Sequence, residues 1–89
     1  MLTAQRIRAT RLKDLMINGN GFAFDPRSGF TYNLSPTGGD VVGWLKDGAD
    51  VPEIVERIVD KYGIDHGTAR EDLQSFLTAL GNYSLIDLV

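Results

Sequence analysis

The side chains that most often carry catalytic chemistry are sparse in this sequence. It contains no cysteine, which excludes disulfides, thiolate nucleophiles and cysteine-ligated metal clusters. His66 is the only histidine, most serines are remote from it in the sequence, and a serine or threonine nucleophile needs a base beside it. We therefore expect His66 to be an exposed residue at a helix start, and we predict no catalytic residue, metal site or cofactor.

Two other patterns resemble chemical sites but have simpler interpretations. Glu53, Glu56 and Asp60 recur at helical spacing on the polar face of an amphipathic segment, which is typical of a solvated helix surface. The glycines in residues 18–21 and 37–39 lack the pattern and the lysine of a phosphate-binding loop. We interpret these stretches as a hairpin turn and a first helical turn, so the function has to come from a binding surface.

The composition is that of an ordinary globular domain, with 43% hydrophobic and 24% charged residues. No stretch approaches the roughly 20 apolar residues of a membrane span, and no apolar run typical of a signal peptide follows the basic N-terminus. We therefore expect a soluble, cytoplasmic protein. Residues 1–89 are predicted to form one domain, with residues 1–11 as a flexible leader.

Local signals predict three strands followed by three helices. Asn18-Gly19 and the turn residues 25–29 separate the strands, whose ranges are about 13–18, 21–25 and 30–34. Helix starts are indicated by Ser35-Pro36, by the capping box of Asp50 and Glu53, and by Asp65. With glycines at their ends, the predicted helices span about residues 36–46, 51–62 and 66–80. The tail, residues 85–89, is expected to be a short strand or a packed terminus.

The apolar pattern predicts how these elements pack. Phe22 and Phe24 are assigned to the same sheet face as Phe30, Tyr32 and Leu34, and we expect the helices to cover that aromatic face. The predicted fold is an α+β domain of the winged-helix type, with a three-stranded antiparallel sheet followed by three helices.

The charge distribution bears on nucleic-acid binding, which winged-helix domains often perform. Residues 1–39 carry five basic and two acidic side chains, a net +3, whereas residues 40–89 carry four basic and ten acidic ones, a net −6. In the third helix, Arg70 is followed by Glu71 and Asp72. Because phosphate neutralisation supplies most non-specific affinity, this acidic helical half disfavours a DNA-binding regulator. That function and a general protein-interaction domain remain the alternatives.

The third strand comes last in the predicted meander and is therefore expected at an edge of the sheet. An edge strand presents unpaired N–H and C=O groups, onto which another strand can add. Thr31 and Asn33 are polar, so an ordinary solvated edge is one interpretation and a peptide-binding edge is the other. The same edge also permits dimerisation by strand pairing, so both a monomer and a dimer are open.

The run from Asp25 to Gly38 resembles the PqqD family. The resemblance covers about residues 13–86 and continues through Trp44–Gly48, Val51–Val55, Tyr62–Gly63, Asp72–Leu73, Phe76–Leu77 and Leu80. It implies a small winged-helix-type peptide chaperone of natural-product biosynthesis, also called a recognition element for ribosomally made, post-translationally modified peptides. Such proteins bind the leader of a precursor peptide and present its core to a modifying enzyme, such as a radical S-adenosylmethionine protein or a leader protease.

The resemblance also implies where the leader lies. It would add as a strand beside the third strand, at Phe30, Thr31, Tyr32, Asn33 and Leu34, and lie against the third helix at Ala69, Arg70, Leu73, Gln74 and Leu77. Arg70 could pair with an acidic leader residue. Leu73 and Leu77 either seat an apolar leader side chain or belong to the core. No nucleic acid and no membrane partner is implied.

Overall fold

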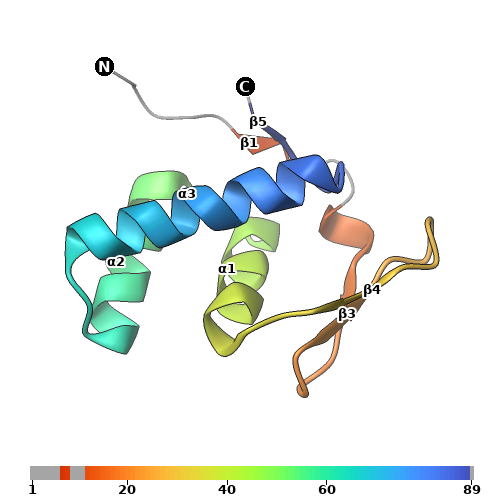
Figure 1. Ribbon diagram of the computed structural model, residues 1–89, viewed down its shortest axis with the longest axis horizontal. Coiled ribbons are helices and arrows are strands. Elements are labelled where there is room, and N and C mark those ends of the chain that lie inside the picture. The colour runs from red at the N-terminus through yellow and green to blue at the C-terminus, as the bar shows by residue number, and fades with distance from the viewer. Residues whose placement is uncertain (1–6, 9–11, 89) are drawn as a thin grey trace.

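The computed structural model describes residues 7–8 and 12–88 (Figure 1). The described elements, in chain order, are β1 (Ile7–Arg8), the 3₁₀ turn η1 (Leu12–Asp14), β2 (Met16–Ile17), β3 (Phe22–Phe24), β4 (Thr31–Asn33), α1 (Pro36–Lys46), α2 (Val51–Tyr62), α3 (His66–Asn82) and β5 (Asp87–Leu88). Strands β2, β3 and β4 form an antiparallel sheet in that order. The predicted α+β arrangement, a three-stranded antiparallel sheet followed by three helices, is confirmed.

The predicted helix starts are confirmed by their capping hydrogen bonds. Ser35 Oγ accepts from the Gly38 N–H at 3.0 Å, which satisfies one of the free donors of α1. At the start of α2, Asp50 and Glu53 each accept from the other's backbone N–H, at 2.9 and 3.2 Å. Asp65 Oδ2 accepts from a backbone N–H in the first turn of α3 at 3.2 Å. These local signals place each helix at the right point in the chain.

The end of α3 differs from the prediction. Gly81 was expected to end this helix, but α3 continues through it to Asn82. The chain reverses instead at Ser84, which adopts a positive φ of 60°, and the Leu85 N–H donates to the Leu80 carbonyl at 3.0 Å. Gly81 keeps a helical conformation, because a glycine only permits the left-handed turn that often ends a helix and does not require it. The helix is therefore longer at the end that lies near the sheet.

The predicted aromatic sheet face is wrong. The register pairs Phe22 with Asn33 and Phe24 with Thr31, so both phenylalanines share the outer face and are 44% and 41% exposed. Ala23, which is 0% exposed, pairs with Tyr32 on the inner face. The reason is the length of the turn after Phe24. It places even-numbered residues of β3 opposite odd-numbered residues of β4, so Phe22 and Phe24 share a face with Asn33 and Thr31 and not with Tyr32. A one-residue difference in register exchanges the two faces of a strand.

The first predicted strand, 13–18, is mostly replaced by η1 and the short strand β2. In the turn that follows, the Asn18 side chain accepts from the N–H groups of Asn20 and Phe22, at 2.9 and 3.1 Å. Within residues 18–21, Gly21 alone has a positive φ. The Asn18 N–H also donates to the Phe22 carbonyl at 2.9 Å, so the loop is longer than the two-residue turn that the Asn-Gly pair indicated.

One hydrophobic core lies between the inner face of the sheet and the helices. It consists of Leu12, Leu15, Ala23, Val41, Val42, Leu45, Ile54, Val55, Ile58, Ala69, Leu73, Leu77, Leu80, Leu85 and Ile86. The last two residues confirm a packed tail, which then pairs as β5 with β1. Of the predicted flexible leader, β1 is described, whereas residues 1–6 and 9–11 lie outside the described residues. No helix among the described residues is long and apolar enough to cross a membrane.

Candidate functional site

The residues considered for catalysis or metal binding are all exposed side chains of α2 and α3, namely Glu53, Glu56, Asp60 and His66. His66 is exposed at the start of α3, as predicted, and its Nε2 lies 2.6 Å from Glu56 Oε2 on α2. Within the part of the chain that the structure describes, no group of three or more histidine, cysteine or acidic side chains could hold a metal ion. The site has to be sought on the open side of the sheet.

Strand β4 pairs with β3 on one side, and no described strand pairs with its other side. The Phe30 carbonyl accepts a hydrogen bond from the β3 side at 2.9 Å, and the Leu34 N–H donates one to that side at 2.6 Å. In an antiparallel pair, every second residue of a strand directs its backbone N–H and C=O groups toward the partner strand, and the residues between direct theirs away from it. Thr31 and Asn33 therefore direct their backbone N–H and C=O groups outward, and the predicted edge at the third strand has the geometry that strand addition needs.

The side chains of this edge divide between two faces. Thr31 and Asn33 are exposed on the outer face, and Phe30, which precedes the strand, is also exposed. Tyr32 and Leu34 are half-buried and pack against the core. A strand added beside β4 would therefore meet Tyr32 and Leu34 on the face that α3 borders.

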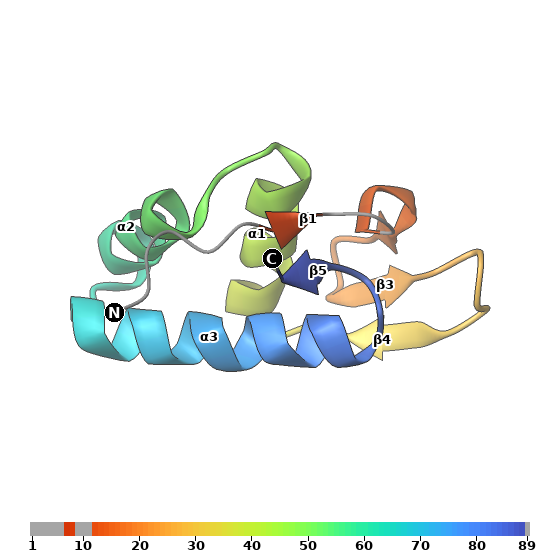
Figure 2. The same ribbon diagram turned by 90° about the horizontal axis from the view of Figure 1, so that it is seen from above.

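An apolar groove lies between β4 and the C-terminal end of α3, and Figure 2 shows the end of α3 next to one end of the strand. We call this hollow of about 300 Å³ the β4–α3 groove. It is lined by Leu15, Thr31, Tyr32, Asn33, Leu34, Phe76, Ala79, Leu80, Tyr83 and Leu85. The rings of Tyr32 and Tyr83 meet edge to face at the groove, with their centroids 5.1 Å apart and their planes at 64°. Backbone groups for pairing and an apolar surface for side chains thus lie next to each other.

The helix residues predicted for the site lie elsewhere on α3. Ala69, Leu73 and Leu77 are buried in the core, and Leu73 also lines a hollow between α1, α2 and α3. Arg70 and Gln74 are exposed, and neither of them lines the β4–α3 groove. None of these five residues lines the β4–α3 groove, and their contact with a leader stays a prediction.

The helix wall of the groove is formed by Phe76, Ala79, Leu80 and Tyr83. These residues recur at helical spacing on one stripe. The prediction ended this helix before Gly81 and therefore left Tyr83 out of it. A helix predicted to extend two residues further would have placed Tyr83 on the same stripe. The spacing of Phe76, Ala79 and Tyr83 was therefore the signal that could have found this wall.

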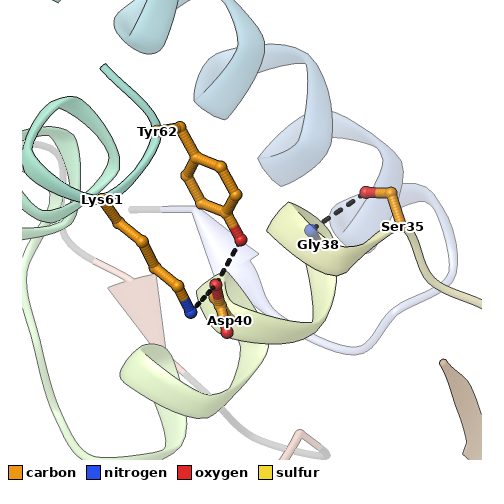
Figure 3. A network of polar contacts seen from close by, with 5 residues as sticks. All are labelled: Ser35, Gly38, Asp40, Lys61 and Tyr62. Atoms are coloured by element: carbon orange, nitrogen blue, oxygen red, sulfur yellow. Dashed lines mark hydrogen bonds and ion pairs between the residues drawn. The ribbon is translucent and has the colours of Figure 1, made fainter. Parts of the chain in front are cut away.

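A polar network fixes the segment that follows β4 (Figure 3). Asp40, near the start of α1, accepts hydrogen bonds from Lys61 Nζ at 2.6 Å and from the Tyr62 hydroxyl at the end of α2. The bonds from Lys61 and then Tyr62 hold the pKa of the Asp40 carboxyl below its usual value of 3.8. The network ties the first turns of α1 to the last turn of α2, and thereby sets where the chain leaves β4.

This lowered pKa predicts an acid-sensitive contribution to stability. A carboxyl with a depressed folded-state pKa stabilises the protein above its unfolded pKa, near 3.8, and loses that contribution as the pH falls through the folded value. We expect urea unfolding to show that Asp40→Asn loses less stability than the wild type between pH 6 and pH 2. The difference should stay below about 1 kcal/mol, because the pair is partly solvated. An identical pH dependence in both proteins would contradict the role given to Asp40.

Residues 21–86 match a family model described as coenzyme PQQ synthesis protein D (PqqD). The chain belongs to the PqqD family. The match confirms the resemblance noted in the sequence, and it spans β3, β4 and the three helices of the structure. No curated protein and no solved structure matched the chain in the corresponding comparisons.

Membership of the PqqD family agrees with a surface-based function. The family is described by its part in coenzyme PQQ synthesis, and a non-catalytic accessory role with peptide and enzyme partners fits it. All residues of the β4–α3 groove except Leu15 lie within the matched span. The groove therefore belongs to the part of this chain that is shared with PqqD.

Proposed function

We propose that this PqqD-family chain is a non-catalytic peptide chaperone. It binds the leader segment of a ribosomally made precursor peptide by strand addition at β4 and presents the peptide to a modifying enzyme. The observation that carries the proposal is the open edge of β4 beside the apolar β4–α3 groove. A radical S-adenosylmethionine protein or a leader protease is the kind of enzyme that would receive the peptide.

The two parts of the site have different tasks in this proposal. The outward N–H and C=O groups of Thr31 and Asn33 pair with the leader backbone, which gives affinity without regard to sequence. Tyr32 and Leu34 form one wall of the groove, and the stripe that ends at Tyr83 forms the other. Alternate side chains of an extended leader point into this groove, so the groove selects the apolar ones.

The exposed residues Arg70 and Gln74 have a supporting part. They lie on the N-terminal half of α3, beyond the groove. A leader long enough to pass Phe76 would reach this half of the helix, where Arg70 is proposed to pair with an acidic side chain. The buried residues Ala69 and Leu77 line neither this groove nor the hollow that Leu73 lines, and they hold α3 in place.

A display selection followed by NMR tests the proposal. A library of random 12-residue peptides is selected against the full chain, and an enriched peptide is titrated into the ¹⁵N-labelled protein. We expect the largest shifts at the amides of residues 31–34 and of residues 76–83. The enriched motif can then be compared with short reading frames of the genome that encodes the chain, in order to find the precursor.

Two results would contradict the proposal. In one, the selected peptides bind but leave the amides of residues 31–34 unmoved. In the other, duplex DNA shifts the exposed face of α3 at low micromolar concentration while no peptide binds, which would favour a nucleic-acid partner. The acidic residues Glu71 and Asp72 on that face make the second result unexpected.

A further inference from the structure

A second hollow adjoins the β4–α3 groove beyond the end of β4. Its volume is about 520 Å³, and it lies between the start of α1, the end of α2 and the middle of α3. The Phe76 side chain lines both hollows, so the two meet at this ring. Ser35 and Gly38 form the side of the second hollow that directly follows β4 in the chain.

The course of the chain aligns the two hollows. β4 ends at Asn33, and the backbone passes Leu34 into the Ser35 cap of α1. A peptide paired with β4 that continues in the same direction therefore passes over Ser35. Ser35 lines the second hollow and follows Asn33 by two residues, so a peptide extended at about 3.3 Å per residue reaches this hollow roughly two residues beyond the paired segment. Whether the peptide pairs parallel or antiparallel to β4, one of its two ends extends toward the second hollow.

The lining of the second hollow has an apolar floor. Val41, Ile58 and Leu73 come from the core, and the Phe76 ring and Ile64 add to the apolar surface. A Cβ at Gly38 would lie 3.2 Å from Phe76 Cε1, a tight contact that the ring would have to relieve by a small shift. The floor is thus closely packed, and the hollow above it suits a bulky apolar side chain.

One acid sets the charge of the second hollow. Among the described residues that line it, Asp72 alone is charged. Asp72 is exposed at the rim, and no described side chain forms a hydrogen bond or ion pair with its carboxylate. A carboxylate at the rim of an apolar hollow favours a ligand with a basic group next to an apolar one.

We propose that the second hollow is a specificity pocket for the same bound peptide. It takes one bulky apolar side chain, aromatic or long aliphatic, and Asp72 selects a lysine or arginine next to that side chain. This inference rests on the proposed strand addition at β4, because the pairing brings the peptide to the hollow. It adds to that proposal a sequence requirement outside the paired segment.

The test is a charge reversal with a matched control on the same helix. The random 12-residue library is selected against the wild type, Asp72→Lys and Glu71→Lys. Both variants replace an acid by a lysine and therefore make the same change in net charge. Glu71 is exposed next to Asp72 in the sequence but does not line the hollow, so only Asp72→Lys changes the charge of the hollow. We expect the wild type and Glu71→Lys to enrich lysine or arginine beside a bulky apolar residue, at a fixed distance from the paired segment. Asp72→Lys should enrich aspartate or glutamate there.

Binding measurements complete the test. A peptide selected on the wild type should bind Asp72→Lys about three- to tenfold more weakly, and Glu71→Lys with little change. It should also shift the methyl resonances of Ile64. If all three proteins enrich the same motif while residues 31–34 still shift, the specificity pocket is wrong and the strand addition stands. If the wild type enriches no peptide, or residues 31–34 do not shift, both proposals are overturned.

Discussion

Replacement of Asn33 by proline is expected to weaken peptide binding about tenfold while the protein stays folded. The Asn33 N–H points away from β3, so its loss removes no hydrogen bond of the sheet. Proline is tolerated on edge strands for this reason. A bound peptide would lose one backbone hydrogen bond, with a net value of about 0.5–1.5 kcal/mol, and would meet the proline ring in its place. A loss near 1.4 kcal/mol is a tenfold change in Kd.

The control for this experiment is Asn33→Ala, which removes the side chain and keeps the N–H. Fluorescence anisotropy with a library-selected peptide should give an affinity close to that of the wild type for Asn33→Ala and a weaker one for Asn33→Pro. Thermal unfolding of both variants checks that the fold survives. Equal affinities of the proline and alanine variants would show that the peptide docks somewhere other than the open edge.

Replacement of Gly21 by alanine is expected to destabilise the protein by about 1–3 kcal/mol. Gly21 has φ of +85°, and holding a residue with a side chain in such a conformation costs an amount of this order. In addition, an added Cβ would lie 2.8 Å from the Leu34 carbonyl oxygen, so the backbone of one strand would have to move. The Leu34 N–H donates to the Gly21 carbonyl at 2.6 Å, so this movement also disturbs the end of β4.

Gly19 is the matched control for Gly21. It belongs to the same loop, lacks a positive φ, and has open space where a Cβ would be added. Urea unfolding should therefore show a marked loss of stability for Gly21→Ala and almost none for Gly19→Ala. Similar values for the two variants would contradict the tight contact between Gly21 and the end of β4.

The sequence predicted the helices well because their signals are local. Ser35 with Pro36, and Asp50 with Glu53, act within one turn of the chain, and no distant contact has to be known. The strand edge at residues 30–34 could also be located, because the order of the elements puts the third strand last. The α+β fold followed from these patterns, whereas the family was indicated by the resemblance of residues 13–86 to PqqD.

The sheet face and the helix wall could not be obtained in the same way. Alternation along one strand does not say which residues of the next strand share its face, because the length of the turn decides the register. Phe22 and Phe24 therefore look like core residues in the sequence, yet they face outward. The helix wall required the true end of α3, and Gly81 permits both the helix and its end. Contacts between segments that are distant in the sequence decide the register of the strands and the end of α3.

The open edge of β4 is short, and its length limits what backbone pairing can achieve. Thr31 and Asn33 offer two N–H and two C=O groups. At about 0.5–1.5 kcal/mol each, they supply at most about 6 kcal/mol, whereas micromolar affinity needs about 8 kcal/mol in addition to the costs of association. Every polypeptide carries the same backbone groups, so chance partners remain weakly bound. Because β4 is short, backbone pairing alone does not reach micromolar affinity. Only a peptide whose side chains also fill the β4–α3 groove binds that tightly.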